Sequence, residues 1–228
     1  MMPPREAQPV AAPADVAHFD ALHRRSDDPW KVRSRWYERR KRDLLLAMLP
    51  RERYGLVFEP GCSVGGNTRA LALRCDRLVA CDSSTAALER ARAALDEDAS
   101  AADGPAAAPP RARIEFRNWA LPRQWPDAPI DLAVVAELAY YLPPADYRDF
   151  LAQLPARLAP DGQLAMCHWR GTVPDAAGGG GDAVHALARD AFGRAGLARV
   201  AQYRDEDFRI DLWQRGGESS VARREGSA

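Results

Sequence analysis

The sequence predicts an α/β fold built on a mostly parallel, doubly wound sheet of seven strands, one of which runs antiparallel. Helical and strand patterns alternate along the 228 residues, and this alternation is typical of a parallel sheet with helices on both faces. The early strands are short and almost continuously apolar, as strands buried on both faces must be. The last two strand patterns are separated by only a few residues, so we expect them to pair antiparallel.

The first predicted element is a helix over residues 26–49. Asp28 is a favourable N-cap, and Pro29 suits the first helical position, where a backbone N–H has no helical partner. Apolar residues recur at four-residue spacing, which predicts that one side of the helix packs against the domain. These residues are Val32, Trp36, Leu44 and Met48.

The elements that follow alternate in type and are separated by turn residues. Strands are predicted at residues 56–59, 77–82, 113–118, 130–137, 162–169, 198–204 and 207–215. Helices are predicted at residues 67–75, 84–95, 145–158 and 183–196.

These elements define a single domain over residues 18–215. The Pro- and Ala-rich segment 1–17 and the polar tail 216–228 are expected to be disordered. A flexible insertion is expected at about residues 96–112. A second loop is expected at residues 174–182, because its four consecutive glycines disfavour both helix and strand.

The composition excludes several classes of protein. The chain carries 32 basic and 32 acidic residues, so no net field attracts nucleic acid or a membrane surface. Neither a membrane-spanning apolar run nor a signal peptide is visible, and we therefore expect a cytoplasmic protein. Four cysteines without a C-x-x-C pair predict small buried side chains rather than a zinc site or disulfides. They are Cys62, Cys75, Cys81 and Cys167.

A glycine-rich turn follows the first strand and carries the main functional signal. In a dinucleotide turn, G-x-G-x-x-G, the second glycine admits the pyrophosphate, but here Ser63 stands between Gly61 and Gly66. Glu59 just before the turn disfavours a phosphate and suits a cation. S-adenosylmethionine carries an ammonium and a sulfonium but no phosphate, and the E-x-G-x-x-x-G turn that ends at Gly65 fits it. We therefore predict this cofactor, with S-adenosyl-L-homocysteine as the product and no metal.

Three later strand ends complete the predicted cofactor site. Asp82 follows Gly61 by 21 residues, where a carboxylate can accept hydrogen bonds from both ribose hydroxyls; the alternative for a strand-end Asp is a helix N-cap. Asn118 and Trp119 end the third strand, where we expect adenine, unless they are a turn Asn and a packing Trp. Glu137 ends the fourth strand, in the crevice where such sheets bind ligands.

Together these motifs resemble those of the class I S-adenosylmethionine-dependent methyltransferases, which have a Rossmann-like sheet. More narrowly, the chain resembles the nodulation protein S family, whose named member N-methylates a deacetylated chitooligosaccharide. The matching segments are "DPW" (28–30), "WYERRK" (36–41), "EPGCSVG" (59–65), "CD" (81–82), "ALPRQWP" (120–126), "DLAVVAELAYYL" (131–142), "HW" (168–169) and "GDAVH" (181–185).

The resemblance implies lid helices at the N-terminus and several contacts with the cofactor. Trp30 is expected near its methionine end. Lys41, or Arg40, is expected to pair with its carboxylate, and Cys62 belongs to the cofactor-binding turn. The insertion near residues 96–112 and the four-glycine loop depart from the family.

Candidates for acceptor binding and catalysis lie after the fourth and fifth strands. His168 ends the fifth strand beside Trp169, and His185 follows the glycine loop. Tyr140 is a candidate to line the acceptor pocket. An amine whose pKa lies about two units above the working pH costs only about 2.7 kcal/mol to deprotonate, whereas a hydroxyl costs far more. An amine acceptor is therefore favoured, with Glu137 or His168 to position it and take its proton.

Four alternatives remain open from the residues alone. They are a small-molecule O-methyltransferase, an NAD(P)-dependent oxidoreductase, a nucleic-acid methyltransferase and a binding module without catalysis. Ser63 and Glu59 count against the oxidoreductase. In "ELAYYLPP" (137–144) the two prolines come too late for the motif of amino-methylating DNA enzymes. We expect a small-molecule acceptor, no nucleic-acid or membrane partner, and a monomer or weak homodimer.

Overall fold

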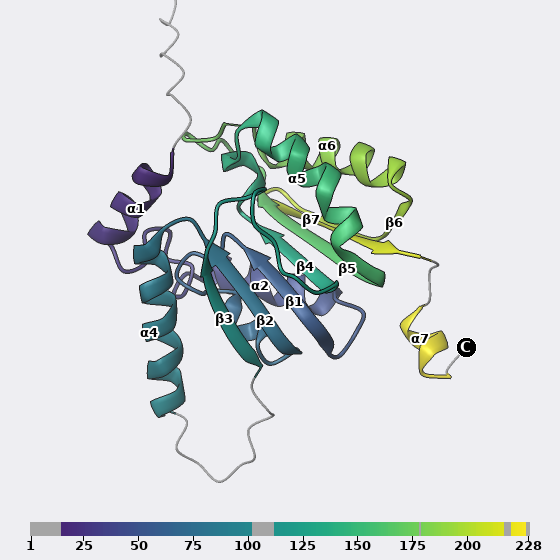
Figure 1. Ribbon diagram of the computed structural model, residues 1–228, viewed down its shortest axis with the longest axis horizontal. Coiled ribbons are helices and arrows are strands. Elements are labelled where there is room, and N and C mark those ends of the chain that lie inside the picture. Colours follow the sequence, from purple (N-terminus) through teal and green to yellow (C-terminus); the bar gives the residue numbers. More distant parts are fainter. Residues whose placement is uncertain (1–14, 102–111, 178, 217–219, 227–228) are drawn as a thin grey trace, which may run out of the picture.

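Seven strands form one sheet in the order β3-β2-β1-β4-β5-β7-β6 (Figure 1). The computed structural model describes residues 15–101, 112–177, 179–216 and 220–226. All neighbouring strands are parallel except β7, which runs antiparallel to both β5 and β6. The predicted fold class is therefore confirmed. The strands are β1 (Tyr54–Pro60), β2 (Cys75–Asp82), β3 (Arg113–Asn118), β4 (Ile130–Ala136), β5 (Leu158–Trp169), β6 (Leu197–Arg204) and β7 (Phe208–Arg215).

Helices cover both faces of the sheet (Figure 1). The helices are α1 (Val16–Arg25), α2 (Trp36–Met48), α3 (Thr68–Leu71), α4 (Thr85–Ala101), α5 (Pro144–Arg157), α6 (Gly181–Arg194) and α7 (Val221–Arg224), with a 3-10 turn, η1 (Ala139–Tyr141). Side chains of α5 and α6 pack with one set of strand residues, which includes Phe58 and Val135. Side chains of α2 and α3 pack with the alternate set, which includes Val57 and Val134. This alternation explains why the strands are apolar throughout.

The predicted helix over residues 26–49 is wrong in its first third. Helix α2 begins at Trp36, and Asp28 instead closes a turn by accepting hydrogen bonds from the backbone N–H groups of Val32 (2.9 Å) and Arg33 (3.0 Å). Lys31 adopts a φ of +57°, a left-handed conformation that no helix interior contains. Asp28 is therefore not a helix N-cap, because its carboxylate accepts from the backbone of a turn that precedes α2.

Helix α1 lies upstream of that turn and was not predicted from the sequence. The carboxylate of Asp15 caps it by accepting from the backbone N–H of His18 (2.9 Å). The helix begins at Val16, two residues before the predicted start of the domain. It packs beside α4 (Figure 1), so the N-terminal segment adds to the same domain.

Other boundaries differ by a few residues. β5 starts at Leu158 rather than at 162, and α3 is a single turn because β2 already begins at Cys75. The predicted tail contains the short helix α7. Most of the predicted insertion lies outside the described residues, as do residues 1–14.

Candidate functional site

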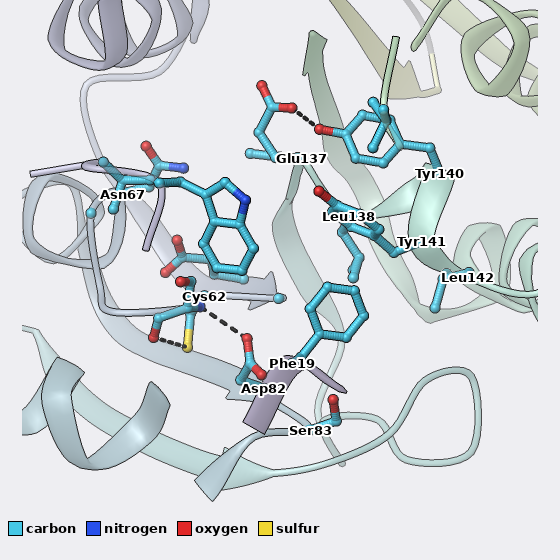
Figure 2. A pocket seen from close by; sticks show the side chains of 18 of the residues that line it. Phe19, Cys62, Asn67, Asp82, Ser83, Glu137, Leu138, Tyr140, Tyr141 and Leu142 are labelled. Atoms are coloured by element: carbon cyan, nitrogen blue, oxygen red, sulfur yellow. Dashed lines mark hydrogen bonds between the residues drawn. The ribbon is translucent and has the colours of Figure 1, made fainter. Parts of the chain in front are cut away.

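A cavity of about 890 Å³ opens at the carboxyl ends of the central strands. The glycine turn after β1, the end of β2 and the segment from Glu137 to Leu142 after β4 form its walls (Figure 2). Helix α1 and the first turn of α2 close its outer side. This is where the topology of an open α/β sheet places a ligand, since the connections diverge to opposite faces on either side of β1.

The glycine turn brings backbone close to the cavity. Gly61 has a φ of +70°, and a Cβ added there would lie 3.0 Å from the Leu138 side chain. The N–H groups of Gly61 and Cys62 both donate to the carbonyl of Cys81, at 2.7 and 3.0 Å, which ties the turn to β2. Gly65, with a φ of +80°, faces Ala91 of α4 instead, so it serves helix packing and does not line the cavity.

Glu59 is a buried carboxyl group at the floor of the cavity. Its Oε2 accepts a hydrogen bond of 2.6 Å from the Thr68 hydroxyl. Burial raises the pKa of Glu59 to about 8, although the Thr68 hydrogen bond opposes the shift; the nearby Asp82 raises it further. Within the described ranges no Lys, Arg or His pairs with this group. A cationic ligand group is what would hold it ionised at neutral pH.

Asp82 lies at the end of β2 and faces the same cavity (Figure 2). Its Oδ2 accepts from the backbone N–H of Ser63 (3.0 Å) and its Oδ1 from that of Ser84 (2.9 Å). Burial raises the pKa of Asp82, while these backbone hydrogen bonds oppose the rise. Each oxygen keeps a lone pair for a ligand hydroxyl. The helix N-cap alternative is wrong, because the Ser84 hydroxyl accepts from the Ala87 N–H (3.1 Å) at the start of α4, while Asp82 lines the cavity. The ribose contact stays a prediction.

Of the two residues predicted to lie beside adenine, Asn118 and Trp119, one lines the cavity and the other does not. Trp119 lines the cavity. The side-chain amide of Asn118 instead donates to the carbonyls of Asp82 (3.1 Å) and Ser83 (2.9 Å). Asn118 is thus the turn residue of the alternative reading, and its amide bridges the ends of β3 and β2.

Glu137 stands at the opposite end of the cavity from Asp82 and Cys62 (Figure 2). Its φ of +54° is left-handed, a conformation that costs a non-glycine residue about 1–3 kcal/mol and is common at functional sites. Its Oε1 accepts from Lys41 Nζ (2.6 Å), and its Oε2 accepts from the Tyr140 hydroxyl and from the backbone N–H of Trp169 (3.1 Å). Three donors therefore hold this carboxylate in one orientation.

Lys41 does not offer a free ammonium group to a ligand. It pairs with Glu38 (2.8 Å) as well as with Glu137, and its side chain is only 8% exposed. Burial favours its neutral form, but the carboxylates of Glu137 and Glu38 outweigh this effect and raise the Lys41 pKa. Arg40 is also engaged, with Asp205 at 2.7 Å, and it does not line the cavity. Lys41 and Arg40, the two residues predicted to pair with the cofactor's carboxylate, are therefore both paired with carboxylates of the protein.

His168 and His185 are corrections to the predicted site. Both side chains are fully buried and neither lines the cavity. They hydrogen-bond to each other through His168 Nδ1 and His185 Nε2 at 3.0 Å. Burial lowers the pKa of both rings. His168 therefore does not contact an acceptor as a base, and His185 does not bind one.

Helix α1 contributes side chains that the sequence did not reveal as part of a site. Phe19 packs edge-on against Tyr141, with ring centroids 4.9 Å apart, and His23 Nε2 lies 3.0 Å from the Ser63 hydroxyl. Asp20 accepts hydrogen bonds from Ser84 and from the backbone at the start of α4. These contacts fasten α1 over the glycine turn as a lid.

The cavity therefore collects most of the predicted site residues. Those that line it are Trp30, Lys41, Glu59, Gly61, Cys62, Asp82, Trp119, Glu137, Tyr140 and Trp169. Tyr37 and Glu38 also line it and were missed. Their spacing from Lys41, one helical turn, was the available signal.

The described residues include neither a metal-binding cluster nor a helix suited to span a membrane. No group of three His, Cys, Asp or Glu side chains in it is arranged to hold a metal ion. None of its helices is both long and apolar enough to span a bilayer.

The chain is similar to nodulation protein S and to a protein described as a methyltransferase. The family model for nodulation protein S (NodS) matches residues 13–104. A nodulation protein S from Rhizobium tropici is 30% identical over 143 residues, which span 62% of this chain and 55% of the relative. A crystal structure from Pseudomonas syringae, provisionally described as a methyltransferase, is 44% identical, with a TM-score of 0.61 over 79% of this chain and 100% of its own.

The fold comparison extends to a more distant enzyme. The N-methyltransferase NodS from Bradyrhizobium japonicum, solved with S-adenosyl-L-homocysteine, is 23% identical with a TM-score of 0.70. That match covers 87% of this chain and 98% of the enzyme. At this identity it establishes that the two share a fold.

Proposed function

We propose that the chain is a member of the nodulation protein S family of S-adenosylmethionine-dependent methyltransferases and that it methylates an amine of a small-molecule or saccharide-like acceptor. The observation that carries the proposal is the Glu137 carboxylate, which three donors hold at the cavity. The acceptor-side walls around it are acidic and aromatic, and include Glu38, Tyr140 and Trp169.

The turn after β1 fits the cofactor. Any Cβ at Gly61 would press on Leu138, so only glycine leaves this backbone open to a ligand. Glu59 is a buried carboxyl that lacks a cationic partner within the described residues, and the cofactor's ammonium can supply one. The Asp82 carboxylate retains lone pairs for the two ribose hydroxyls, with Trp119 beside it for the base.

A different cation takes over the role that the sequence assigned to Lys41. Arg35, the residue before α2, lines the cavity, and its guanidinium makes no hydrogen bond or ion pair with the residues that the structure describes. We assign the cofactor's carboxylate to Arg35, whose planar group can bind a carboxylate through two hydrogen bonds.

An amine suits the acceptor end better than a hydroxyl. Among the described residues, Glu137 Oε1 accepts from Lys41 alone. A carboxylate oxygen has about two acceptor positions, so one remains for an amine N–H. The hydroxyl of Tyr37 is buried without a hydrogen-bond partner among the described residues, which favours a polar ligand or water at this end.

When bound, S-adenosylmethionine supplies an electrophilic methyl group on a sulfonium, which leaves as the thioether of S-adenosylhomocysteine. The protein's part is alignment: Glu137 orients the amine so that its lone pair faces the methyl carbon. Burial and the neighbouring Glu137 raise the Tyr140 pKa, so its hydroxyl stays protonated and acts as a donor to Glu137. After transfer, the ammonium product can release its proton toward the Glu137 carboxylate.

A methyl-transfer screen tests the proposal directly. Purified protein with S-adenosylmethionine is expected to methylate amino sugars or polyamines, and to leave catechols and other hydroxyl acceptors unmodified. Mass spectrometry of the products identifies the methylated atom. Methylation of hydroxyl acceptors alone would show that the amine assignment is wrong.

Changes at the acceptor end should lower turnover rather than cofactor binding. Glu137→Gln is expected to reduce kcat by about 100-fold, because it removes the group that orients the amine and takes its proton. Tyr140→Phe should cost about tenfold, since Lys41 and Trp169 still hold the carboxylate. Steady-state kinetics measures both values.

Tyr147→Phe is the matched control for these changes. Its hydroxyl is buried and donates to the Val184 carbonyl at 2.8 Å, away from the cavity. This variant is expected to lose stability but keep kcat. Glu137→Gln with wild-type kcat would remove Glu137 from the mechanism.

A further inference from the structure

A continuous chain of hydrogen bonds runs through the buried interior behind the acceptor end of the cavity. Asp211 Oδ2 on β7 lies 2.6 Å from His185 Nδ1 on α6, and His185 Nε2 lies 3.0 Å from His168 Nδ1 at the end of β5. The backbone N–H of Ala139 then donates to His168 Nε2 at 3.1 Å. The side chains of Asp211, His185 and His168 are all fully buried.

The two ends of this chain set the position of every proton in it. The Ala139 N–H can only donate, so His168 Nε2 must be bare and the His168 proton must sit on Nδ1. That proton points at His185 Nε2, so the His185 proton must sit on Nδ1 and point at Asp211. Arg209, at 2.7 Å from Asp211, keeps the acceptor end ionised. Both imidazoles are therefore neutral Nδ1–H tautomers, and no donor meets a donor.

The far end of the chain holds the backbone that positions Glu137. Ala139 starts η1, directly before Tyr140, whose hydroxyl donates to Glu137. The His168 ring packs edge-on against the Tyr140 ring, with centroids 5.2 Å apart. The next residue, Trp169, donates its own N–H to Glu137. His168 is therefore linked to two of the three donors to Glu137. Tyr140 follows Ala139, which hydrogen-bonds to His168, and Trp169 follows His168 in the sequence.

We propose that Asp211, His185 and His168 are positioning residues, a proton-ordered chain that fixes η1 and thereby holds Glu137 and Tyr140 in their working orientation. This inference rests on the proposed function of Glu137. None of these three side chains lines the cavity, so their effect on turnover comes through the contacts that His168 makes with η1, chiefly the hydrogen bond from Ala139.

A matched pair of substitutions at His168 separates its two hydrogen bonds. Gln places its amide near the position of Nε2 and can still accept from the Ala139 N–H, whereas Asn reaches only the position of Nδ1 and keeps the bond to His185. His168→Gln is expected to keep kcat within about threefold of wild type. His168→Asn is expected to lose about 10- to 100-fold in kcat, because misplaced groups lower turnover by that order, with little change in KM.

A purely structural role predicts a different result. If these rings only filled the core, Asn and Gln would lower kcat alike, or both would leave it unchanged, and either outcome overturns the proposal. Tyr54→Phe is the control, since it breaks a buried 2.7 Å hydrogen bond to Gln163 at the other end of β5. It is expected to lower the melting temperature without changing kcat.

The proton order can also be measured without any variant. ¹⁵N NMR of the folded wild-type protein should show both rings as neutral Nδ1–H tautomers; an Nε2–H on either ring overturns the proton order even if a variant fails to fold. Turnover is measured with whichever acceptor the wild type methylates. Hydroxyl specificity would therefore contradict the amine proposal while the ranking of the two His168 variants still tests the chain.

Discussion

Replacing Glu59 with Gln is expected to weaken cofactor binding by about 100-fold while making the protein more stable at pH 8. The loss follows because the variant removes the buried carboxylate that we propose as the partner of the cofactor's ammonium, and losing one partner of a buried ion pair costs about 3 kcal/mol or more. The Thr68 hydroxyl can donate to the new amide oxygen as it does to Glu59, so the fold keeps its hydrogen bond. Calorimetric titration with S-adenosylhomocysteine measures the affinity.

The gain in stability has a definite pH dependence. Burial raises the Glu59 pKa from its ordinary value of 4.5 to about 8, so between these values the folded protein holds a proton that the unfolded chain releases. The free energy of unfolding of the wild type must then fall as the pH rises. Gln does not titrate, so the advantage of the variant should grow by about 1.4 kcal/mol per pH unit from pH 5 to pH 8. Thermal unfolding across this range gives the slope.

Glu115→Gln provides a control with the opposite sign. Arg77 and Arg117 lower the Glu115 pKa to about 2, so its charge stabilises the fold above the ordinary pKa and that contribution is lost as the pH falls. This variant should be less stable than wild type at neutral pH and should bind the cofactor normally. A Glu59→Gln protein with wild-type affinity would contradict the assignment of the cofactor's ammonium to Glu59.

Replacing Lys41 with Met is expected to lower the free energy of unfolding by about 3 kcal/mol. Lys41 Nζ lies 2.8 Å from Glu38 and 2.6 Å from Glu137. Removing it leaves two carboxylates facing each other with only partial access to water, and breaking a buried pair in this way is strongly destabilising. Urea denaturation measures the change. kcat should fall as well, because the Glu137 carboxylate loses one of its three donors.

The neighbouring residue supplies the comparison. Arg40 lies on the same helix as Lys41 and pairs with Asp205, but the two side chains are 35% and 25% exposed, so Arg40→Met should cost about 1 kcal/mol or less. Adding Glu38→Gln to Lys41→Met should recover part of the lost stability, because it removes one of the unpaired carboxylates. Equal stability of the Lys41 and Arg40 variants would argue against a buried charge cluster.

Local chemistry predicted the sheet, the glycine turn and the acidic residues at the strand ends. The bounds of β2 and β4 are predicted within two residues, because a strand buried on both faces has a nearly continuous apolar run. Glu59 is predictable because it directly precedes the glycine turn, and Asp82 because it follows that turn by one βα unit. Helix α1 was missed, since its sequence is polar and its stability comes from contacts with Ser63, Ser84 and Tyr141.

The sequence by itself thus determined the fold class, the family resemblance and the residues at the cavity floor. Only the tertiary structure decided which polar side chains are free to meet a ligand. Lys41, Asn118, His168 and His185 all looked available along the chain, yet each is occupied by partners far away in sequence, such as Glu137, Asp82, Ala139 and Asp211. A residue's position in a motif follows from local spacing, but its hydrogen-bond partners depend on which strands and helices the fold brings together.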